Sequence, residues 1–286
     1  MAKGTQIKRR IKSIKSMLQV TKAMELISSI KMRKANEAAL RSKAYVFESW
    51  RSVIRLSRMP ENKNVRFFKP QLKGKVLALV ITSDKGLCGS FNTDILRKCV
   101  DFIKENGQEN IDFITVGNKG RDFIKKIGGN IVADFPPYQQ VRFTMASPIG
   151  SLGYNGFVSG KYSRFVSIHT HFESAISKNA TVLQILPFDI KNIEGDRTEE
   201  SIDYKFEPSK KEVLPEIVKQ TVRALAYQVI LESEAAEHAS RMIAMKNATD
   251  AAEELKEDFE FTYNQLRQQN ITQELAEISA GVETIS

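Results

Sequence analysis

Two long stretches without proline, one at each end of the chain, constrain the fold more than any other feature. The first runs from Gly4 to Arg58. Its apolar residues step by four and three, as a heptad seam does: Ile7, Ile11, Ile14, Leu18 and Thr21. A second apolar stripe lies beside the first: Met17, Val20, Met24 and Ile27. The pattern predicts one helix with a broad apolar face, and Pro60 is expected to end it.

The second stretch occupies the C-terminal end. Ser209 and Glu212 form a capping box with Pro208 just outside it, but Pro215 interrupts, which predicts a helix start a few residues later. The following residues keep a three-four spacing: Met242, Met245, Thr249, Ala252, Leu255, Phe259, Thr262 and Leu266. The seam then shifts to a second set: Ile271, Leu275, Ile278, Val282 and Ile285. A second very long helix is therefore predicted.

The lengths of these helices decide the expected architecture. At 1.5 Å per residue they would span about 80 Å and about 105 Å. A compact globule of 286 residues has a radius of gyration of only about 19 Å. We therefore expect the two ends to pair as a long antiparallel coiled coil that projects from a globular body.

Between the two ends the apolar period changes to that of strands and short helices. Strands are predicted at 75–82, 111–117, 130–135, 164–172 and 181–188, with helices at 92–106 and 118–127. This alternation predicts an α/β fold class, with a central Rossmann-like α/β domain and an open, mostly parallel sheet. The Gly/Ser-rich segment 147–163 resembles a loop, and helical content within it is left open. The expected domains are the helix 1–60, the α/β domain 70–195 and the helix 209–286.

The charge of the chain is concentrated at its ends. Residues 1–60 hold 15 Lys/Arg against 3 Asp/Glu, whereas residues from 209 onward hold 8 against 14. Opposite charges favour pairing of the two ends, and the remaining positive charge indicates an acidic partner. A basic heptad helix could instead grip DNA, but no separate dimerisation zipper is evident and the opposite helix is acidic.

The segment "ITSDKGLCGSFN" (81–92) follows a predicted strand and precedes a predicted helix, which is the arrangement of phosphate-binding loops. It lacks both the Gly-Lys-Ser/Thr ending of a P-loop and the G-x-G-x-x-G spacing. The alternative is a turn from Gly86 to Gly89 that needs glycine for positive φ. Asp84 and Lys85 could be catalytic, yet no Ser-His or paired-carboxylate set surrounds them. A stand-alone nucleotide enzyme is therefore not favoured.

Metal and membrane signals are weak. His169 and His171 share one face of a strand, but no third ligand is evident. Cys88 and Cys99 match no metal or redox spacing and suggest a reducing compartment. No apolar run approaches the roughly 20 residues of a membrane span, and the basic N-terminus lacks the apolar region of a secretory signal. A cytoplasmic protein without cofactor or metal is expected.

Three segments resemble one family. The segment "IKRRIKSIKSMLQVTKAMELISSIKMRKA" (7–35) closely resembles the N-terminal helix of the gamma subunit of F-type ATP synthase. The loop "ITSDKGLCGSFN" is similar to the loop of that family, which usually has Arg at Lys85 and Gly at Ser90. The segments "ESEAAEHASRMIAMKNATDAAEEL" (232–255) and "YNQLRQQNITQELAEISAG" (263–281) are similar to its C-terminal helix. The likeness is weakest at about 136–215.

The resemblance implies a non-catalytic rotor shaft that couples ion flow through the membrane to ATP synthesis or hydrolysis in the beta subunits. The implied partners are a ring of alpha and beta subunits, the epsilon subunit and the membrane c-ring, with one copy per complex on the cytoplasmic face of a bacterial plasma membrane. Neither nucleic acid binding nor membrane insertion is implied. The residues expected to contact the head are Lys8, Arg9, Arg10, Met24, Lys31, Arg33, Lys34, Asp84, Lys85, Gly86, Leu87, Cys88, Arg267, Gln268 and Thr272.

The chain also departs from the family pattern. Leu266, Gln269 and Asn270 replace smaller residues near the expected upper contact, and Val282 replaces a usual Ala. Pro215 is unusual at the start of the last helix. The Cys-containing regulatory insertion of the chloroplast form is absent, so thiol control of that kind is not expected.

Overall fold

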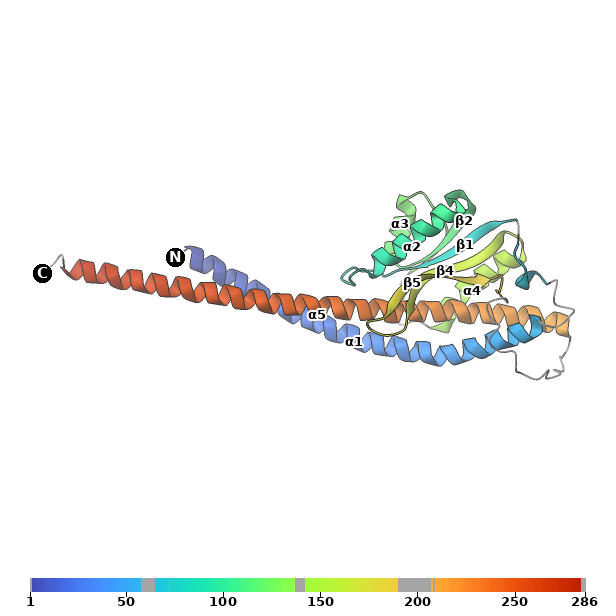
Figure 1. The fold of residues 1–286 in the computed structure, drawn as a ribbon, viewed down its shortest axis with the longest axis horizontal. Helices are drawn as coiled ribbons and strands as arrows, with labels where there is room; N and C mark the ends of the chain where they lie inside the picture. The colour runs from blue at the N-terminus through green and yellow to red at the C-terminus, as the bar shows by residue number, and fades with distance from the viewer. Residues whose placement is uncertain are drawn as a thin grey trace. The chain divides into compact units, whose positions relative to one another are not determined.

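A computed structural model describes residues 2–57, 65–71, 73–136, 142–189, 207 and 209–283. The chain divides into two compact units, one of Met1–Ser29 with Arg241–Ser286 and one of Ile30–Ser240. Helix α1 (Ala2–Ser57) and helix α5 (Lys210–Glu283) each contribute to both units and are blue and orange-red in Figure 1. The expected helix end at Pro60 lies outside the described residues. In the described part of the chain, no helix combines the length and the apolar character that crossing a bilayer requires.

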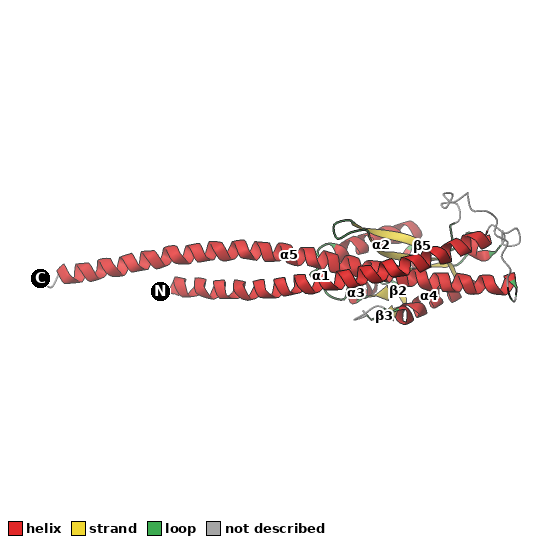
Figure 2. Cartoon of the chain, turned by 90° about the horizontal axis from the view of Figure 1, so that it is seen from below, coloured by secondary structure: helices red, strands yellow, loops and turns green. Residues whose placement is uncertain are grey.

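The first unit is an antiparallel helix pair. The hydroxyl of Thr249 on α5 donates to that of Thr21 on α1 at 2.8 Å, and Lys15 forms an ion pair with Glu260 at 2.9 Å. An earlier residue of α1 thus meets a later residue of α5, so the two ends of the chain lie at the same end of the pair (Figure 2). This confirms the predicted antiparallel pairing.

The seam of this pair differs in part from the expected one. Ile11, Thr21, Met245, Thr249 and Ala252 are buried as predicted. After Ala252, however, Leu255 is 51% exposed and Thr262 is exposed, while Lys256 and Tyr263 are half-buried. After Ala252 the inward-facing positions therefore follow at a step of four and then three, where the sequence predicted three and then four. Lys256 can take such a position because the methylene chain of a lysine covers a seam while its ammonium stays in water.

The second unit contains a five-stranded sheet in the order β3-β2-β1-β4-β5. Its strands are β1 (Lys75–Ile81), β2 (Ile111–Val116), β3 (Asn130–Phe135), β4 (Tyr162–Phe172) and β5 (Lys178–Leu186). The first four are parallel, and only β5 runs antiparallel, against β4. Leu79 in the central strand pairs with Ile114 of β2 and Ser167 of β4. The predicted open, mostly parallel sheet is confirmed.

Helices cover both faces of this sheet. Val76, Ala78 and Val80 of β1 belong to one core cluster with residues of α2 (Phe91–Asn106) and α3 (Asn118–Lys126). Leu77 and Leu79 belong to the other cluster, with α1, α4 (Phe143–Val158) and α5. A parallel strand buried on both faces is expected to be apolar throughout, as β1 is. Two short 3-10 helices, η2 (Arg66–Phe68) and η3 (Gln108–Asn110), precede β1 and β2.

The loop predicted at 147–163 is wrong, because Phe143–Val158 form helix α4. Its glycines serve close packing. A Cβ at Gly150 would lie 2.6 Å from the Cα of Arg223, and one at Gly153 would lie 2.4 Å from the ring of Phe165. Glycine and serine are typical of turns, but small residues also allow a helix to approach its neighbours closely.

Helix α5 begins earlier than predicted. It starts at Lys210 and contains Pro215 inside its second turn. The hydroxyl of Ser209 donates to the carboxylate of Glu212 at 2.9 Å, and the backbone N–H of Glu212 donates to the carbonyl of Ser209. Ser209 and Glu212 are thus in contact at the helix start, but through these two bonds and not through the reciprocal side-chain to backbone bonds of the predicted capping box.

Candidate functional site

The glycine loop between β1 and α2 is tied together by its own polar groups. The backbone N–H of Ser83 donates to Oδ1 of Asn92 at 3.0 Å, and Nδ2 of Asn92 donates to the Ser83 hydroxyl at 2.7 Å. That hydroxyl donates to the carbonyl of Lys85 at 2.6 Å. The Cys88 thiol is buried and lies 3.2 Å from Nδ2 of Asn92. Side chains of the chain itself therefore fill the inside of the loop.

The conformation of this loop corrects the expectation for Gly86. Positive φ occurs at Leu87 (62°) and Gly89 (55°), but not at Gly86. A leucine in the left-handed region is strained, and such strain persists only where the surroundings fix it. The side chain of Leu87 is 62% exposed, so the loop presents an apolar group outward and holds Cys88 inward.

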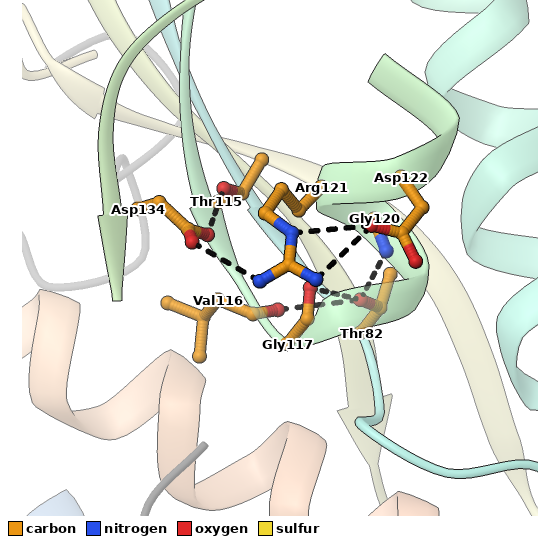
Figure 3. Close-up of polar contacts among 8 residues, drawn as sticks. All are labelled: Thr82, Thr115, Val116, Gly117, Gly120, Arg121, Asp122 and Asp134. Atoms are coloured by element: carbon orange, nitrogen blue, oxygen red, sulfur yellow. Dashed lines mark hydrogen bonds and ion pairs between the residues drawn. The ribbon is translucent and has the colours of Figure 1, made fainter. Parts of the chain in front are cut away.

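The carboxyl ends of β1 and β2 meet the start of α3 in a second polar cluster (Figure 3). The backbone N–H of Gly120 donates to Oγ1 of Thr82 at 2.7 Å. Gly117 has a φ of +90°, and a Cβ there would lie 2.2 Å from the carbonyl oxygen of Thr82. Ligands of open α/β sheets bind outside the carboxyl ends of the strands. Here Thr82 already takes an N–H of the first turn of α3, a group that could otherwise bind an anion.

Arg121 closes the same cluster toward the edge strand. Its guanidinium lies 3.1 Å from Asp122 and 3.5 Å from Asp134, and Asp134 also accepts the hydroxyl of Thr115 at 2.6 Å. The hydrogen bond to Asp122, opposed by burial and aided by the charges of both carboxylates, raises the pKa of Arg121. The cluster joins β2, β3 and α3, which is a structural role.

The second apolar stripe of α1 faces outward in the helix pair. Met17, Val20 and Ile27 are 56%, 57% and 54% exposed, while Met24 is half-buried. The Met24 carbonyl accepts the hydroxyl of Ser28 at 2.7 Å. Contiguous exposed apolar side chains mark interaction surfaces. Described residues of the same unit leave Met17, Val20 and Ile27 largely uncovered, so this stripe is a candidate contact surface.

The predicted basic residues lie in two groups, and all are exposed. Lys8, Arg9 and Arg10 belong to the first unit, where the Arg10 guanidinium lies over the ring of Phe259 at 5.7 Å. Lys31, Arg33 and Lys34 belong to the second unit. Of these six, none forms a salt bridge with any described residue. Most of this positive charge is thus available to a partner.

The far end of α5 also exposes its predicted residues. Arg267, Gln268 and Thr272 are exposed, and the Thr272 hydroxyl donates back to the Gln268 carbonyl at 3.0 Å. The predicted seam in this region is uncovered, with Ile271, Leu275 and Ile278 exposed by 48%, 60% and 64%. The side chain of Val282 lies outside the described residues.

The two strand histidines share one face, as predicted, but each has another partner. Nδ1 of His169 lies 3.1 Å from the hydroxyl of Ser167, and Nδ1 of His171 lies 2.7 Å from the carboxylate of Glu232. Burial, the largest cause, lowers the pKa of His169 to about 4. Within the described ranges no group of three or more His, Cys, Asp or Glu side chains could hold a metal ion.

Sequence reasoning did not single out Glu234 on α5. The pKa of the Glu234 carboxyl is raised to about 7, chiefly by burial and next by the charge of Glu237. The charge of Lys31 opposes this rise. Nε2 of His238 lies 3.9 Å from this carboxyl. No motif marks such a residue, because its pKa depends on the burial that neighbouring helices impose.

Comparison with known proteins decides the family. A family model described as ATP synthase matches residues 3–285. The ATP synthase gamma chain of Roseiflexus castenholzii is 34% identical over 297 residues, covering 100% of this chain and 99% of its own. The chain belongs to the ATP synthase gamma-chain family. The gamma chain of Pelotomaculum thermopropionicum is 35% identical over 277 residues and 96% of each chain.

Solved structures show the same fold. A chain of the Euglena gracilis mitochondrial ATP synthase, in a structure of OSCP, F1 and c-ring, has a TM-score of 0.68 at 18% identity and covers 99% of this chain and 95% of its own. A chain of the Tetrahymena thermophila central stalk and c-ring has a TM-score of 0.63 at 24% identity and covers 80% of this chain and 99% of its own. Family membership confirms the expected role: this gamma chain is the non-catalytic central rotor shaft of an ATP synthase.

Proposed function

We propose that this gamma chain turns inside a ring of alpha and beta subunits and transmits torque from a c-ring, with the epsilon subunit beside it. We further propose that each complex contains one copy of this chain and that its rotation is coupled to ion flow at the cytoplasmic face of a bacterial plasma membrane. One similar structure is that of OSCP, F1 and a c-ring, and another is that of a central stalk and a c-ring. Those assemblies support partners of this kind.

The observation that carries the proposal is the outward stripe of α1. Met17, Val20 and Ile27 are more than half exposed and lie on the same helix as cations that form no salt bridge with described residues. A surface that slides past several different subunits needs contacts without fixed hydrogen-bond geometry, which apolar and flexible side chains such as Met provide. Exposed cations add attraction that is weak at each pair and depends on salt.

Two further surfaces are assigned to the head in the same way. The glycine loop offers Lys85, Gly86 and Leu87 at its surface, with Asp84 half-buried beside them, while Cys88 stays inside and fixes the loop shape. The end of α5 offers Arg267, Gln268 and Thr272 next to the uncovered stripe of Ile271 and Leu275. Both surfaces combine exposed apolar and polar groups, as the cores and rims of protein interfaces do.

Charge substitution tests the basic surface in the assembled complex. Replacing Lys8, Arg9, Arg10, Lys31, Arg33 and Lys34 together by Gln should weaken assembly or coupling, with the larger loss at low salt, because unscreened attraction is then removed. The control replaces six exposed cations of α2 and α3 by Gln: Arg97, Lys98, Lys104, Lys119, Lys125 and Lys126. Normal assembly and coupling of the first variant at every salt concentration would contradict the proposal.

Substitution of Met24 tests the apolar stripe. Because Met24 is half-buried, a lysine there can extend its ammonium to water and should leave the helix pair folded. We expect Met24→Lys to assemble but to lower the ratio of ATP-driven ion pumping to ATP hydrolysis. Met17→Lys, at a site that is 56% exposed, should act in the same direction. Unchanged ratios in both assembled variants would exclude the stripe as a moving contact.

Nucleotide titration tests the non-catalytic reading of the loop. The polar groups of Ser83 and Asn92 bond each other, and Thr82 takes the N–H of Gly120. We therefore expect the purified chain to show no calorimetric heat of ATP binding in the micromolar range. A micromolar dissociation constant that is lost in Asn92→Ala would overturn this reading.

A further inference from the structure

The second unit contains a pocket of about 560 Å³ between the β4–β5 hairpin and the two long helices. All of its lining residues lie within Ile30–Ser240, so one unit builds the whole pocket. Its walls are mainly apolar and include Val46 and Trp50 of α1, Leu183 of β5, and Leu225 and Val229 of α5. Pockets of a few hundred cubic ångströms with apolar walls and a few polar groups are typical of small-molecule sites.

The polar end of the pocket is formed by β4 and α5. His169 is 2% exposed, and its Nδ1 lies 3.1 Å from the hydroxyl of Ser167. That hydroxyl also donates to the carbonyl of Leu183 at 3.5 Å, and in the tautomer with Nδ1–H its oxygen accepts the hydrogen bond of His169. The other ring nitrogen, Nε2, then carries a lone pair. Among the described residues, the hydrogen bond of the His169 ring is made through Nδ1.

A second unpaired acceptor lies at the same end. Gln228 lines the pocket and is 6% exposed. Its amide nitrogen donates to Glu232 at 2.9 Å, but its buried Oε1 has no hydrogen-bond partner in the described part of the chain. A buried acceptor without a donor is costly. This end of the pocket therefore presents a buried acceptor to which no described donor is bonded, although Asn179 and Thr181 also line the pocket.

The charges around the pocket are already matched. Each oxygen of the Glu232 carboxylate has a partner. Its Oε1 accepts the amide N–H of Gln228, and its Oε2 lies 2.7 Å from Nδ1 of His171. Lys43 lies at the outer part of the lining and is exposed. A charged ligand would find no buried counter-ion, and burying an unpaired charge is strongly unfavourable.

We propose that this pocket binds an uncharged, mainly apolar small molecule that carries one hydroxyl or N–H donor. The apolar body lies against Val46, Trp50 and Leu225, and the donor bonds Nε2 of His169. Phe47 is 56% exposed, and the His171 side chain is 45% exposed. Both line the pocket, so they mark the side from which a ligand enters.

The chain carries its own reporter for this binding, because Trp50 is its single tryptophan. Trp50 lies in the pocket wall and meets the ring of Phe188 edge-on, with centroids 4.9 Å apart. The probe is para-tert-butylphenol, and its methyl ether, para-tert-butylanisole, is the matched compound without a donor. Titration of the full chain with the phenol should change the Trp50 emission to saturation. The ether should bind about tenfold more weakly, since one buried hydrogen bond is lost.

Two substitutions locate the site. Leu183→Phe enlarges a side chain at a wall position that is 39% exposed and should weaken phenol binding about tenfold by filling space. Ile176→Phe is the control, because Ile176 is 89% exposed in the turn before β5 and does not line the pocket. It should bind the phenol as the parent chain does.

His169→Phe tests the donor contact and should bind the phenol no better than the ether. If that variant does not fold, the comparison of phenol with ether in the parent chain decides the donor contact alone. The proposal is overturned by any of three results: no saturable change up to the solubility of the phenol, equal binding of phenol and ether, or unchanged binding in Leu183→Phe.

Discussion

Two parts of α5, one in each unit, share the same helical backbone but lie in opposite surroundings. Within residues 218–240 buried side chains point in every direction around the helix. Within residues 253–276 no described side chain is fully buried. The first part lies in the core beside the sheet, whereas the second has one neighbouring helix, along only part of its length. An unbroken helix therefore says little about how much each of its residues contributes to stability.

The composition of the two parts follows from these surroundings. The buried part is rich in Ala and Val, and its polar groups bond locally or to the sheet. For example, Ser233 accepts the backbone N–H of Thr170 of β4 at 3.2 Å, and Thr221 donates to the carbonyl of Ile217 at 2.8 Å. The exposed part is rich in Glu, Asp and Gln, which solvate well. Helix packing on several sides selects small and apolar residues, and packing on one side selects a narrow seam.

The largest expected difference comes from the same substitution in each part. Ala226 is 0% exposed, so Ala226→Lys should lower the free energy of unfolding by about 4 kcal/mol, because a lysine must be buried in a filled core. Ala251→Lys, at an exposed position of α5, should change it by less than about 0.5 kcal/mol. Urea unfolding followed by Trp50 fluorescence measures both. Equal losses would show that the two parts do not differ in the way described.

A buried carboxylate of the sheet gives the next largest effect. Asp112 is 2% exposed and accepts hydrogen bonds from Asn130 at 2.9 Å, Lys75 at 3.1 Å and the Tyr162 hydroxyl at 3.1 Å. Burial raises the pKa of Asp112, but these hydrogen bonds and the charge of Lys75 outweigh it, so the net pKa is lowered. Asp112→Asn should cost about 2 kcal/mol, whereas Asp101→Asn, at an exposed site, should cost almost nothing.

The sign of the pH dependence checks the same residue. A lowered folded-state pKa means that Asp112 contributes stability above its unfolded value of about 3.9. That contribution is lost as the pH falls through the lower folded pKa. The gap between the parent chain and Asp112→Asn should therefore narrow in acid unfolding below about pH 4. A constant gap would assign the effect to packing alone.

Glu234 tests the buried part of α5 with the opposite sign. Its pKa is raised to about 7, chiefly by burial, so the folded state binds a proton that the unfolded state releases above about pH 4.3. Stability should fall as the pH rises from that value to about 7 and then level off. Glu234→Gln removes this loss, so its stability relative to the parent chain should rise by about 2–3 kcal/mol between pH 5 and pH 8. Glu253→Gln, at an exposed site, should show no such dependence.

Much of this architecture could be predicted from the sequence, because its periodicities are long. Proline-free heptads indicated both long helices, and the apolar run at 75–82 indicated the central strand that β1 (Lys75–Ile81) forms. Proline and glycine were the main sources of error. Pro215 lies within α5 instead of before it, and the glycines of α4 allow close packing against Arg223 and Phe165 instead of forming a loop. Both residues break helices locally unless tertiary contacts compensate.

The candidate surfaces were predictable only in part. Charge asymmetry and the second stripe indicated the outward faces of α1 without the structure. The raised pKa of Glu234 and the pocket around Trp50 were not predictable, because both depend on residues of α1, β4, β5 and α5 that are distant in sequence. The shift of the seam after Ala252 was not predictable either. From the sequence alone an apolar residue such as Leu255 is expected in the seam before a charged one such as Lys256.

The smallest expected effect is in the exposed helix pair. Lys15 and Glu260 lie 2.9 Å apart, with side chains 57% and 39% exposed. The hydrogen bond from Lys15 is the largest cause that lowers the pKa of Glu260. Burial opposes it, and the charges of Lys15 and Lys256 lower the pKa further. Any stability from this pair is present above the unfolded pKa of about 4.3 and is lost as the pH falls through the lower folded value.

A double-mutant cycle of Lys15→Gln and Glu260→Gln, read by thermal unfolding of the full chain followed by circular dichroism, measures this pair. Its coupling should be just resolvable at low salt and vanish at physiological salt, because solvent screens exposed charges and the long side chains lose entropy on pairing. A coupling that persists in high salt would mean that this part of the helix pair is drier than its exposure indicates. The contrast between the two parts of α5 would then be smaller than the buried fractions suggest.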